Sequence, residues 1–333
     1  MKSLVLHAPK NLTYETEWSE PVLPEGWTCV KVHACGICGS DLPRIMQTGA
    51  YHHPMVPGHE CSGEVVSSSA PGVTVGQRVT VLPIIPCGEC AGCQVGPFHC
   101  THYDFIGSRR DGGFAEYVAV PPQNLFQLPD NLSYEDGAFI EPVSVTLHVL
   151  RRSGMTPGAR VLVFGGGAIG ILTAQWASIL GASEVVLADV RDESLAVASA
   201  CKIEHTLNPL SDGFKALDSF DYIFEAAGST SALLSGIEKA KARATLTVVG
   251  REVKDTVIPL AAFERLMRKE LTLKGCWGYD LQGDTGLVYE TFAQGKLTLA
   301  PMITNRLDLR QGPESIAGMW NKSFFYCKAM FVL

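Results

Sequence analysis

The chain has 333 residues, 46% of them hydrophobic and 18% charged, which suits about two domains with sizeable cores. The formal net charge of −7 excludes a partner bound through clustered Lys and Arg, so we expect no nucleic-acid partner. The 11 cysteines are an odd number, and the start "MKSLVLHAPKNL" lacks the apolar core of a signal peptide. We therefore expect a cytoplasmic location, where clustered cysteines more often bind metal or react than form disulfides.

The chain up to about residue 148 is predicted to be rich in short strands. Runs of β-forming residues alternate there with turns marked by Gly and Pro. The expected strands are "LVLH", "CVKVHA", "CSGEVVS", "QRVTVLP" and "FAEYVAV". This pattern favours a β-barrel-like domain with long functional loops.

After residues 155–158 ("MTPG") strands begin to alternate with helices. The strand "RVLVFG" is followed by the helix "AIGILTAQWASILG", and the strand "EVVLADV" by the helix "DESLAVASAC". Further strands are expected at "FDYIFEAAG", "ATLTVVG" and "LTLKGCWG", and the tail "YCKAMFVL" resembles a closing strand. Such alternation predicts a parallel, doubly wound α/β sheet.

Residues 161–183 contain no charged side chain and are long enough to span a bilayer. Three consecutive glycines stand near the start of this stretch, and no basic cluster flanks it on one side. A buried strand, a glycine turn and a buried helix explain it better, so we expect no membrane partner.

The turn "VLVFGGGAIG" contains the spacing G-x-G-x-x-G as Gly165, Gly167 and Gly170. It follows a predicted strand and opens a predicted helix at Ala168 and Ile169, which is the context that dinucleotide binding requires. Gly165 permits the tight turn, Gly167 lets the backbone approach a pyrophosphate, and Gly170 lets the helix pack on the strand. A glycine-rich turn that binds no nucleotide is the alternative.

Asp189 ends the next strand, 19 positions after Gly170. A carboxylate there accepts hydrogen bonds from the ribose hydroxyls and repels a 2′-phosphate, so NAD(H) is favoured over NADP(H). Arg191 stands two residues on and can soften that preference.

Four cysteines lie within 14 residues in the segment "CGECAGCQVGPFHC". They are Cys87, Cys90, Cys93 and Cys100. Four thiolates close a tetrahedral zinc site, which is structural because it leaves no open position. An iron–sulfur cluster and four ordinary buried thiols are the alternatives, and His99 and His102 are possible substitute ligands.

Three separated segments offer a second group of metal ligands: "HACGICGSD", "VPGHECSGEV" and "FIEPVSVTLH". Cys38 is a soft ligand, whereas His59, Glu60 and Glu141 are harder, and a catalytic zinc keeps one position open for water or substrate. Cys35 and Cys38 also have the spacing of a redox disulfide, and His59 and Glu60 by themselves are weak evidence.

Over essentially its whole length the chain resembles the zinc-dependent medium-chain alcohol dehydrogenases. The motifs are "GICGSD", "GHE", the four-cysteine segment, "DGGFAEY", "EP" and "GGGAIG". The resemblance implies a GroES-like β-rich catalytic domain of residues 1–148 and 284–333, and a Rossmann domain of residues 149–283 that binds NAD. It also implies a homodimer or homotetramer, by analogy alone.

The resemblance implies roles for single residues as well. Cys38, His59 and Glu60 match the catalytic zinc ligands of the polyol branch of the family, and Glu141 matches an acid that ligates the metal or binds its water. Ser40 matches the hydroxyl that passes the substrate proton outward, and Cys35 matches nothing required.

Two departures from the family pattern stand out. Six residues separate Cys93 from Cys100 where relatives usually have seven, which puts occupancy of the structural zinc site in doubt. Many relatives also have His after "CGSDL" where this chain has Pro43, so the proton relay beyond Ser40 must differ.

Within the family the chain resembles polyol dehydrogenases through "CGSDLPRI", "YDFIGSRRDGGFAEY" and "EDGAFIEP". The expected reaction is NAD-dependent oxidation of galactitol 1-phosphate to tagatose 6-phosphate. Arg forks suit phosphate oxygens, so Arg44, Arg109 and Arg110 are candidate phosphate ligands, and Tyr51 is a candidate pocket residue.

Three alternatives remain open for the substrate and the function. The arginines can instead be a solvated charge pair or bridge to Asp111. The substrate can be a free polyol such as sorbitol or iditol, a butanediol or threonine. The chain can also be a non-enzymatic nucleotide or redox sensor, although a sensor needs no open metal site.

Overall fold

The structure is a computed structural model that describes residues 1–252, 254–280 and 283–333. The chain divides into two compact units. The first unit comprises Met1–Glu141 and Ile303–Leu333, and the second comprises Pro142–Met302.

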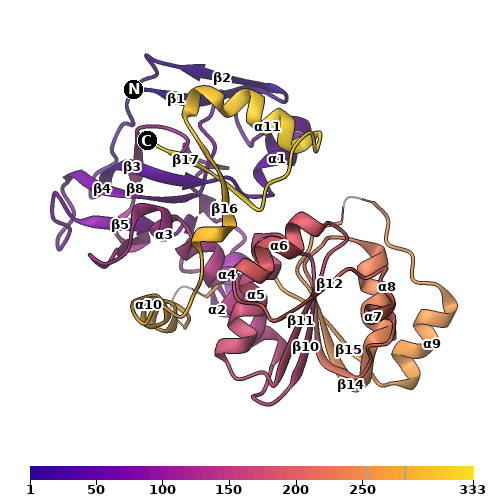
Figure 1. Cartoon of the computed structure of the whole chain (residues 1–333). Helices are drawn as coiled ribbons and strands as arrows, with labels where there is room; N and C mark the ends of the chain where they lie inside the picture. The colour runs from indigo at the N-terminus through magenta and orange to yellow at the C-terminus, as the bar shows by residue number, and fades with distance from the viewer. Residues whose placement is uncertain (253, 281–282) are drawn as a thin grey trace. The chain divides into compact units, whose positions relative to one another are not determined.

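The first unit is built on a mixed sheet with the order β16-β17-β3-β4-β5-β9, in which β8 also pairs with β3. Its strands are β3 (Thr28–Gly36), β4 (Glu60–Ser68), β5 (Arg78–Val81), β8 (Tyr117–Val120), β9 (Leu125–Gln127), β16 (Ile303–Leu307) and β17 (Lys328–Val332). The tail is the closing strand that the sequence predicts, and it lies antiparallel to β3 (Figure 1). The C-terminal tail therefore joins a sheet whose strands β3, β4, β5, β8 and β9 come from the first half of the chain.

Smaller elements surround this sheet. They are β1 (Ser3–Ala8), β2 (Asn11–Glu15), β6 (Ile84–Ile85), β7 (Asp104–Phe105), α1 (Asp41–Pro43), the π-helix η1 (Arg44–Thr48), α2 (Ala91–Val95), the 3₁₀ helices η2 (Pro97–His99), η3 (Pro122–Asn124) and η5 (Leu309–Gln311), α3 (Tyr134–Ala138) and α11 (Gly312–Trp320). The strands predicted for this part of the chain are confirmed as β1, β3, β4, β5 and β8. Alternate side chains of β3 are fully buried, which explains why its sequence alternates.

The second unit is a six-stranded parallel sheet with the order β12-β11-β10-β13-β14-β15. Its strands are β10 (Arg160–Phe164), β11 (Glu184–Ala188), β12 (His205–Leu207), β13 (Phe220–Glu225), β14 (Ala240–Val248) and β15 (Thr272–Gly275). Numbered along the chain this order is 3-2-1-4-5-6, in which the reversal next to the first strand opens a crevice for a dinucleotide. The predicted doubly wound sheet is confirmed.

Helices α5 (Ala168–Ile179) and α6 (Asp192–Ala200) pack against β10, β11 and β12, and α8 (Thr230–Lys239) packs against β13 and β14. The other helices of this part of the chain are α4 (Ile140–Ser153), α7 (Asp212–Lys215), α9 (Leu260–Arg268) and α10 (Thr285–Ala293), with the 3₁₀ helix η4 (Ala300–Met302) after them. Figure 1 shows α5 and α6 on one face of the sheet and α7 and α8 on the other. The uncharged stretch 161–183 is β10 followed by α5, and Trp176 anchors α5 by donating its indole N–H to Val143 O at 3.1 Å.

No described helix is both long and apolar enough to cross a bilayer. The apolar side chains of α5 are instead covered by protein, since Ile171, Leu172 and Trp176 are fully buried.

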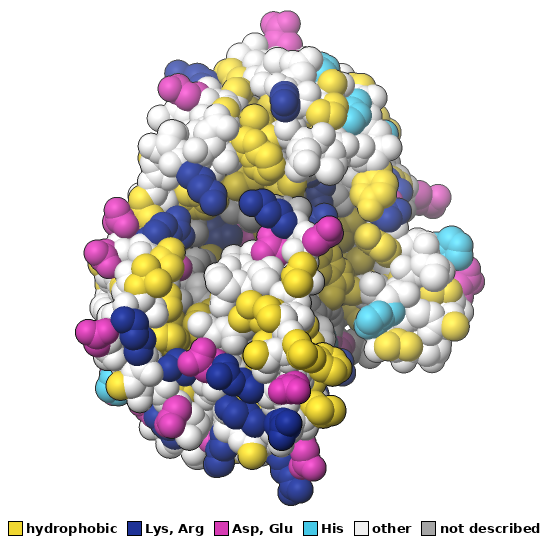
Figure 2. All heavy atoms as spheres, turned by 90° about the vertical axis from the view of Figure 1, so that its right-hand side faces the viewer, with side chains coloured by type: hydrophobic (Ala, Val, Ile, Leu, Met, Phe, Trp, Pro, Cys, Tyr) yellow, Lys and Arg dark blue, Asp and Glu magenta, His cyan; other side chains and the backbone are white. Residues whose placement is uncertain are grey.

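One helix of the second unit keeps an apolar face exposed. Leu260, Phe263 and Met267 follow one side of α9 and are 74%, 53% and 59% exposed. Figure 2 faces this side of the chain and shows hydrophobic side chains among Lys, Arg, Asp and Glu rather than a field of one sign.

Candidate functional site

Cys38, His59 and Glu60 place their ligand atoms within 4.8 Å of one another. Cys38 lies just after β3, whereas Glu60 is the first residue of the neighbouring β4 and His59 immediately precedes it. The antiparallel register puts Gly36 opposite Glu60, which brings the two segments together. His59 and Glu60 are 4% and 2% exposed. One sulfur, one nitrogen and one carboxylate are therefore gathered around a point where a zinc ion could bind.

The missing side chain of Gly36 makes room for one of these ligands. A Cβ atom at this position would collide with Oε2 of Glu60. The glycine in "ACGIC" thus has a local purpose, which is to admit the carboxylate to the end of β3.

Asp41 supports two members of the cluster. It is fully buried in α1, accepts the backbone N–H of Cys38 at 3.0 Å, and places Oδ1 3.2 Å from His59 Nδ1. Burial would lower the pKa of His59, but Asp41 and Cys38 raise it well above its usual value. A carboxylate behind Nδ1 leaves Nε2 to face a metal, an arrangement common around zinc. Asp41 belongs to the "CGSD" motif, yet sequence reasoning assigned it no role.

Lys328 is a buried cation beside the same cluster, and sequence reasoning missed it as well. It is 4% exposed at the start of β17, and its Nζ donates to both carboxylate oxygens of Glu60, at 2.9 and 2.7 Å. The surrounding carboxylates raise the pKa of Lys328 although burial opposes this shift. The available signal was the single charge in the apolar run "YCKAMFVL".

Glu141 lies in the first turn of α4 and is not among the side chains whose ligand atoms cluster with those of Cys38, His59 and Glu60. Burial raises the pKa of its carboxyl to about 7; His59 and Lys328 oppose the shift, and Glu60 adds to it. The cluster itself offers a thiolate, an imidazole and a carboxylate in one buried place, which is a donor set that fits zinc.

Ser40 lies beside the cluster, where its Oγ donates to Cys38 Sγ at 3.3 Å. Pro43 follows in α1 and has no side-chain donor or acceptor. A hydroxyl is therefore present next to the proposed ligands, while a side-chain relay through position 43 is excluded.

Cys35 points away from a pairing with Cys38. It lies opposite Cys61 in the β3–β4 register and is fully buried. Burial raises the pKa of its thiol well above the usual value, which makes it a poor nucleophile. Among the described residues, Cys35 and Cys38 do not form a disulfide. This geometry gives the redox-disulfide alternative no support.

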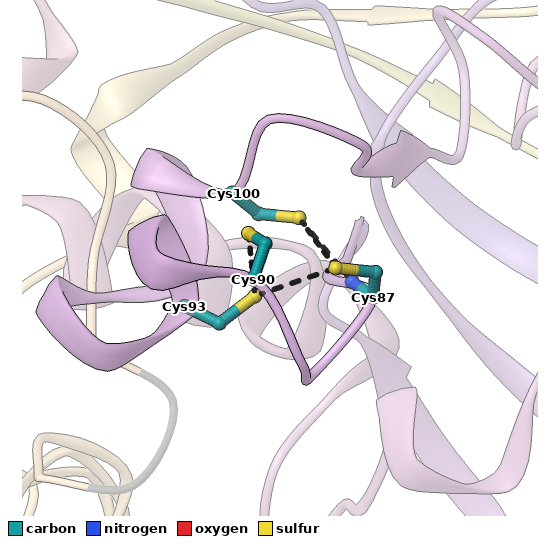
Figure 3. A group of neighbouring side chains, drawn as sticks. All are labelled: Cys87, Cys90, Cys93 and Cys100. Atoms are coloured by element: carbon teal, nitrogen blue, oxygen red, sulfur yellow. Dashed lines mark hydrogen bonds between the residues drawn. The ribbon is translucent and has the colours of Figure 1, made fainter.

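The four cysteines of the second candidate metal site point toward a common centre (Figure 3). Sulfur–sulfur distances are 3.8 Å for Cys87–Cys93, 3.6 Å for Cys90–Cys93 and 3.5 Å for Cys100–Cys87. A tetrahedron with zinc–sulfur bonds of about 2.3 Å requires separations of about 3.8 Å. The geometry fits a single ion. An iron–sulfur cluster would spread the sulfurs over several irons, farther apart.

The short spacing from Cys93 to Cys100 does not keep the fourth sulfur away. The chain returns through η2, and Gly92 of α2 packs directly against the carbonyl of His99. A Cβ atom on Gly92 would collide with this carbonyl, so the tight return depends on glycine there. Neither His99 nor His102 belongs to the ligand cluster.

We expect Gly92→Ala to remove Cys100 from the four-sulfur cluster. The bound zinc, measured by elemental analysis, should fall by about one ion per chain, and Tm should fall because zinc binding stabilises the loop. Gly96→Ala is the matched control. The backbone of Gly96 is extended, and a Cβ atom there would meet only the His99 ring, at 3.6 Å. Equal zinc contents in the two variants would contradict this account of the loop.

The glycine loop of the second unit connects β10 to α5. Gly165 has φ +106°, and Gly167 has open space where its Cβ would be. A Cβ atom on Gly170 would collide with the carbonyl of Gly165. The hydrogen bonds of α5 begin with the backbone N–H of Ile171, which donates to Gly167 O at 3.0 Å. The N–H groups of residues 168–170 are thus those that a helix N-terminus offers to a phosphate.

Asp189 lies just after β11 and faces this loop. Its carboxylate accepts the N–H of Gly166 at 2.7 Å and the N–H of Arg191 at 2.8 Å. The Arg191 side chain places Nε 3.7 Å from the same carboxylate. The acid is therefore fixed at the edge of the loop, as ribose recognition requires.

The three candidate arginines of the first unit have different surroundings. Arg44 donates to Asp41 at 2.9 Å, and Arg110 pairs with Asp104. Arg109 instead lies between two aromatic rings, 4.0 Å from the centre of Tyr51 and 4.2 Å from that of Tyr103. Among the described residues no carboxylate pairs with Arg109.

Other contacts connect the arginine loop with the first metal site. Phe105 O accepts the N–H groups of Arg109 and Arg110, and the Phe105 ring packs edge-on against His59 with centroids 5.5 Å apart. Asp111 accepts the N–H of Val56 at 2.8 Å, and the ion pair of Arg110 is with Asp104 rather than with Asp111. Arg109 is held in a turn whose base contacts a candidate zinc ligand.

Two family models match the chain. The alcohol dehydrogenase GroES-like domain matches residues 24–130, and the zinc-binding dehydrogenase model matches residues 168–294. Among curated proteins, galactitol 1-phosphate 5-dehydrogenase of Escherichia coli K12 is 37% identical over 306 residues, which are 86% of this chain and 88% of that protein.

Solved structures agree with these matches. A galactitol-1-phosphate dehydrogenase from Escherichia coli is similar over 100% of both chains, with 32% identity and a TM-score of 0.91. A zinc-binding dehydrogenase from Sinorhizobium meliloti 1021, bound to NADP, has 29% identity and a TM-score of 0.89, covering 100% of this chain and 99% of its own. An Escherichia coli alcohol dehydrogenase complexed with NADH has 27% identity and a TM-score of 0.88 with the same coverage.

These findings confirm the α/β architecture of a GroES-like part and a Rossmann part, and they indicate zinc and a nicotinamide cofactor. The chain belongs to the zinc-dependent medium-chain alcohol dehydrogenases, a family of NAD(P)-dependent oxidoreductases.

Proposed function

We propose that this enzyme oxidises a secondary alcohol of a polyol phosphate, galactitol 1-phosphate to tagatose 6-phosphate, with NAD. The position of Arg109 supports this choice of substrate. Its guanidinium lies between the rings of Tyr51 and Tyr103, on the turn whose Phe105 ring packs against His59. A guanidinium with no carboxylate partner in the described part of the chain suits a phosphate.

The proposed catalytic zinc ligands are Cys38, His59 and Glu60, with Glu141 as a further ligand, directly or through water. When bound, zinc polarises the substrate hydroxyl as a Lewis acid and NAD accepts the hydride. Asp41 keeps the His59 ring oriented. Ser40 Oγ would accept the proton that the substrate hydroxyl loses while its own hydroxyl proton passes outward to solvent, because Pro43 offers no side-chain relay.

For the cofactor we propose that residues 149–283 form the NAD-binding domain, and residues 1–148 and 284–333 the GroES-like catalytic domain. The pyrophosphate would lie against Gly165, Gly167 and the N–H groups of Ala168, Ile169 and Gly170. These N–H groups precede the first bonded turn of α5, which supports this placement. Asp189 would accept the ribose hydroxyls and exclude the 2′-phosphate of NADP.

The proposed structural zinc is bound by the four cysteines of the loop 87–100, and the sulfur separations support it. Thiolate ligands must stay reduced, which agrees with the proposed cytoplasmic location. We also propose a homodimer or homotetramer. The exposed edge of β15, with Leu273 and Trp277 at 45% and 64% exposure, offers a surface for it.

Arg109→Ala tests the phosphate proposal. We expect the KM for galactitol 1-phosphate to rise about tenfold to a hundredfold, since a hydrogen bond to a charged group contributes about 1.5–3 kcal/mol. Turnover of free galactitol should not change. Arg110→Ala should have a smaller effect, because Asp104 already pairs with that guanidinium.

Arg310→Ala is the control for a general loss of positive charge in the same unit. Its side chain is 71% exposed and pairs with Asp308. Equal KM values for the phosphorylated substrate in the Arg109 and Arg310 variants would show that Arg109 does not bind the substrate phosphate.

A further inference from the structure

Lys328 and Glu60 form an ion pair inside the proposed catalytic metal site, and nothing in the proposed reaction uses it. The ammonium donates to both oxygens of Glu60, at 2.9 and 2.7 Å, and to Ile37 O at 3.4 Å. The two side chains are 5% and 2% exposed. Glu60 is thus shared between a fixed cation and the point where its carboxylate would meet zinc.

The sheet prevents Lys328 from leaving this position. It starts β17, and two residues on Met330 pairs with Gly36, the last residue of β3. Gly36 in turn lies opposite Glu60 in β4. Three adjacent strands therefore fix Lys328, Gly36 and Glu60 relative to one another. Because the Lys328 side chain is buried, it cannot exchange Glu60 for water as a partner.

A cation behind a metal ligand acts in the opposite sense to a carboxylate behind one. Asp41 behind His59 makes the imidazole a stronger donor, as a negative outer partner does. Lys328 instead withdraws charge from Glu60 and repels a divalent ion. A carboxylate has about four lone-pair sites, so Glu60 can still bind the ion while it holds the lysine, but more weakly.

We propose that Lys328 is a positioning residue that holds Glu60 partly away from the metal and so loosens zinc at the Cys38–His59–Glu60 site. A looser bond to Glu60 keeps the ion electron-poor and its open position exchangeable, which serves substrate binding and product release. The inference rests on the proposed metal site.

The test measures zinc release from the full-length, zinc-loaded enzyme after mixing with an excess of a chromophoric chelator. Lys328→Met keeps the length of the side chain and removes its charge. The catalytic-site ion should leave at least about tenfold more slowly than in the wild type, a typical size for an outer-partner change. Lys328→Arg should release it at the wild-type rate. The ion held by the four cysteines is the internal control and should leave at an unchanged rate.

A purely structural lysine predicts the reverse, because a loosened site loses its ion faster. Unchanged or faster release in Lys328→Met overturns the proposal, and Lys328→Gln repeats the test should the methionine variant not fold. Glu60→Gln completes a double-mutant cycle with Lys328→Met. In the Glu60→Gln enzyme, adding Lys328→Met should no longer slow the release of the catalytic-site ion.

The zinc content separates this inference from the proposed function. Wild-type enzyme that binds and releases only the four-cysteine ion overturns the metal site and the lysine proposal together. Two released ions with no slowing in Lys328→Met overturn the lysine proposal alone.

Discussion

Cys38→Ser is expected to remove one zinc ion per chain and to lower kcat/KM at least about a thousandfold. The thiolate is the one soft ligand in the cluster with His59 and Glu60, and a serine hydroxyl stays protonated at neutral pH. Losing a Lewis acid removes several kcal/mol of transition-state stabilisation, and each 1.36 kcal/mol is about tenfold in rate. Elemental analysis and initial rates on the same sample measure both effects.

Cys35→Ala is the control that the C-x-x-C spacing offers. Cys35 lies opposite Cys61 and is fully buried, so its loss should leave zinc content unchanged and activity within about twofold. A redox pair predicts that both variants behave alike and that the wild type forms a reversible disulfide. That pattern, or full zinc retention in Cys38→Ser, would contradict the proposed ligand set.

Asp189→Asn is expected to lower the preference for NAD over NADP by about tenfold to a hundredfold in kcat/KM. The substitution removes the charge that repels a 2′-phosphate but keeps an oxygen to accept the Gly166 N–H. It also removes the negative charge 3.7 Å from Arg191 Nε, so that this guanidinium can contribute to binding the phosphate. A hydrogen bond to a charged group contributes about 1.5–3 kcal/mol, which sets the expected range.

Asp192→Asn is the matched control, because this exposed acid lies only three residues away in the first turn of α6. In this variant the ratio of kcat/KM with NAD to kcat/KM with NADP should equal the wild-type ratio. Were the two aspartate variants to give the same ratio, Asp189 would not be the residue that selects the cofactor.

The local parts of the fold could be predicted because each leaves a short-range pattern. Glycine spacing, strand runs and helix runs identify β10, the loop after it and α5, all within one continuous stretch. β12 escaped prediction because its three residues, His205–Leu207, are partly exposed and carry no alternation. The order of the strands is likewise not encoded locally, since β10 lies between β11 and β13.

The candidate site likewise contains residues that short motifs could identify and residues that they could not. The motif residues Cys38, His59 and Glu60 could be identified from short segments, and the structure brings their ligand atoms together. Lys328 could not be identified in this way, because 268 positions separate it from Glu60 and the contact exists only once β17 joins β3. The role of Gly92 was equally hidden, since its tight packing against His99 depends on the path of the whole loop.

NADH formation with galactitol 1-phosphate beside galactitol, sorbitol and threonine, before and after chelation, tests the proposed reaction. We expect turnover that prefers the phosphorylated alditol and is lost when the catalytic zinc is removed. Turnover that survives chelation would contradict the zinc mechanism. A preference for a free polyol or threonine would keep that mechanism and contradict the phosphate specificity assigned to Arg109.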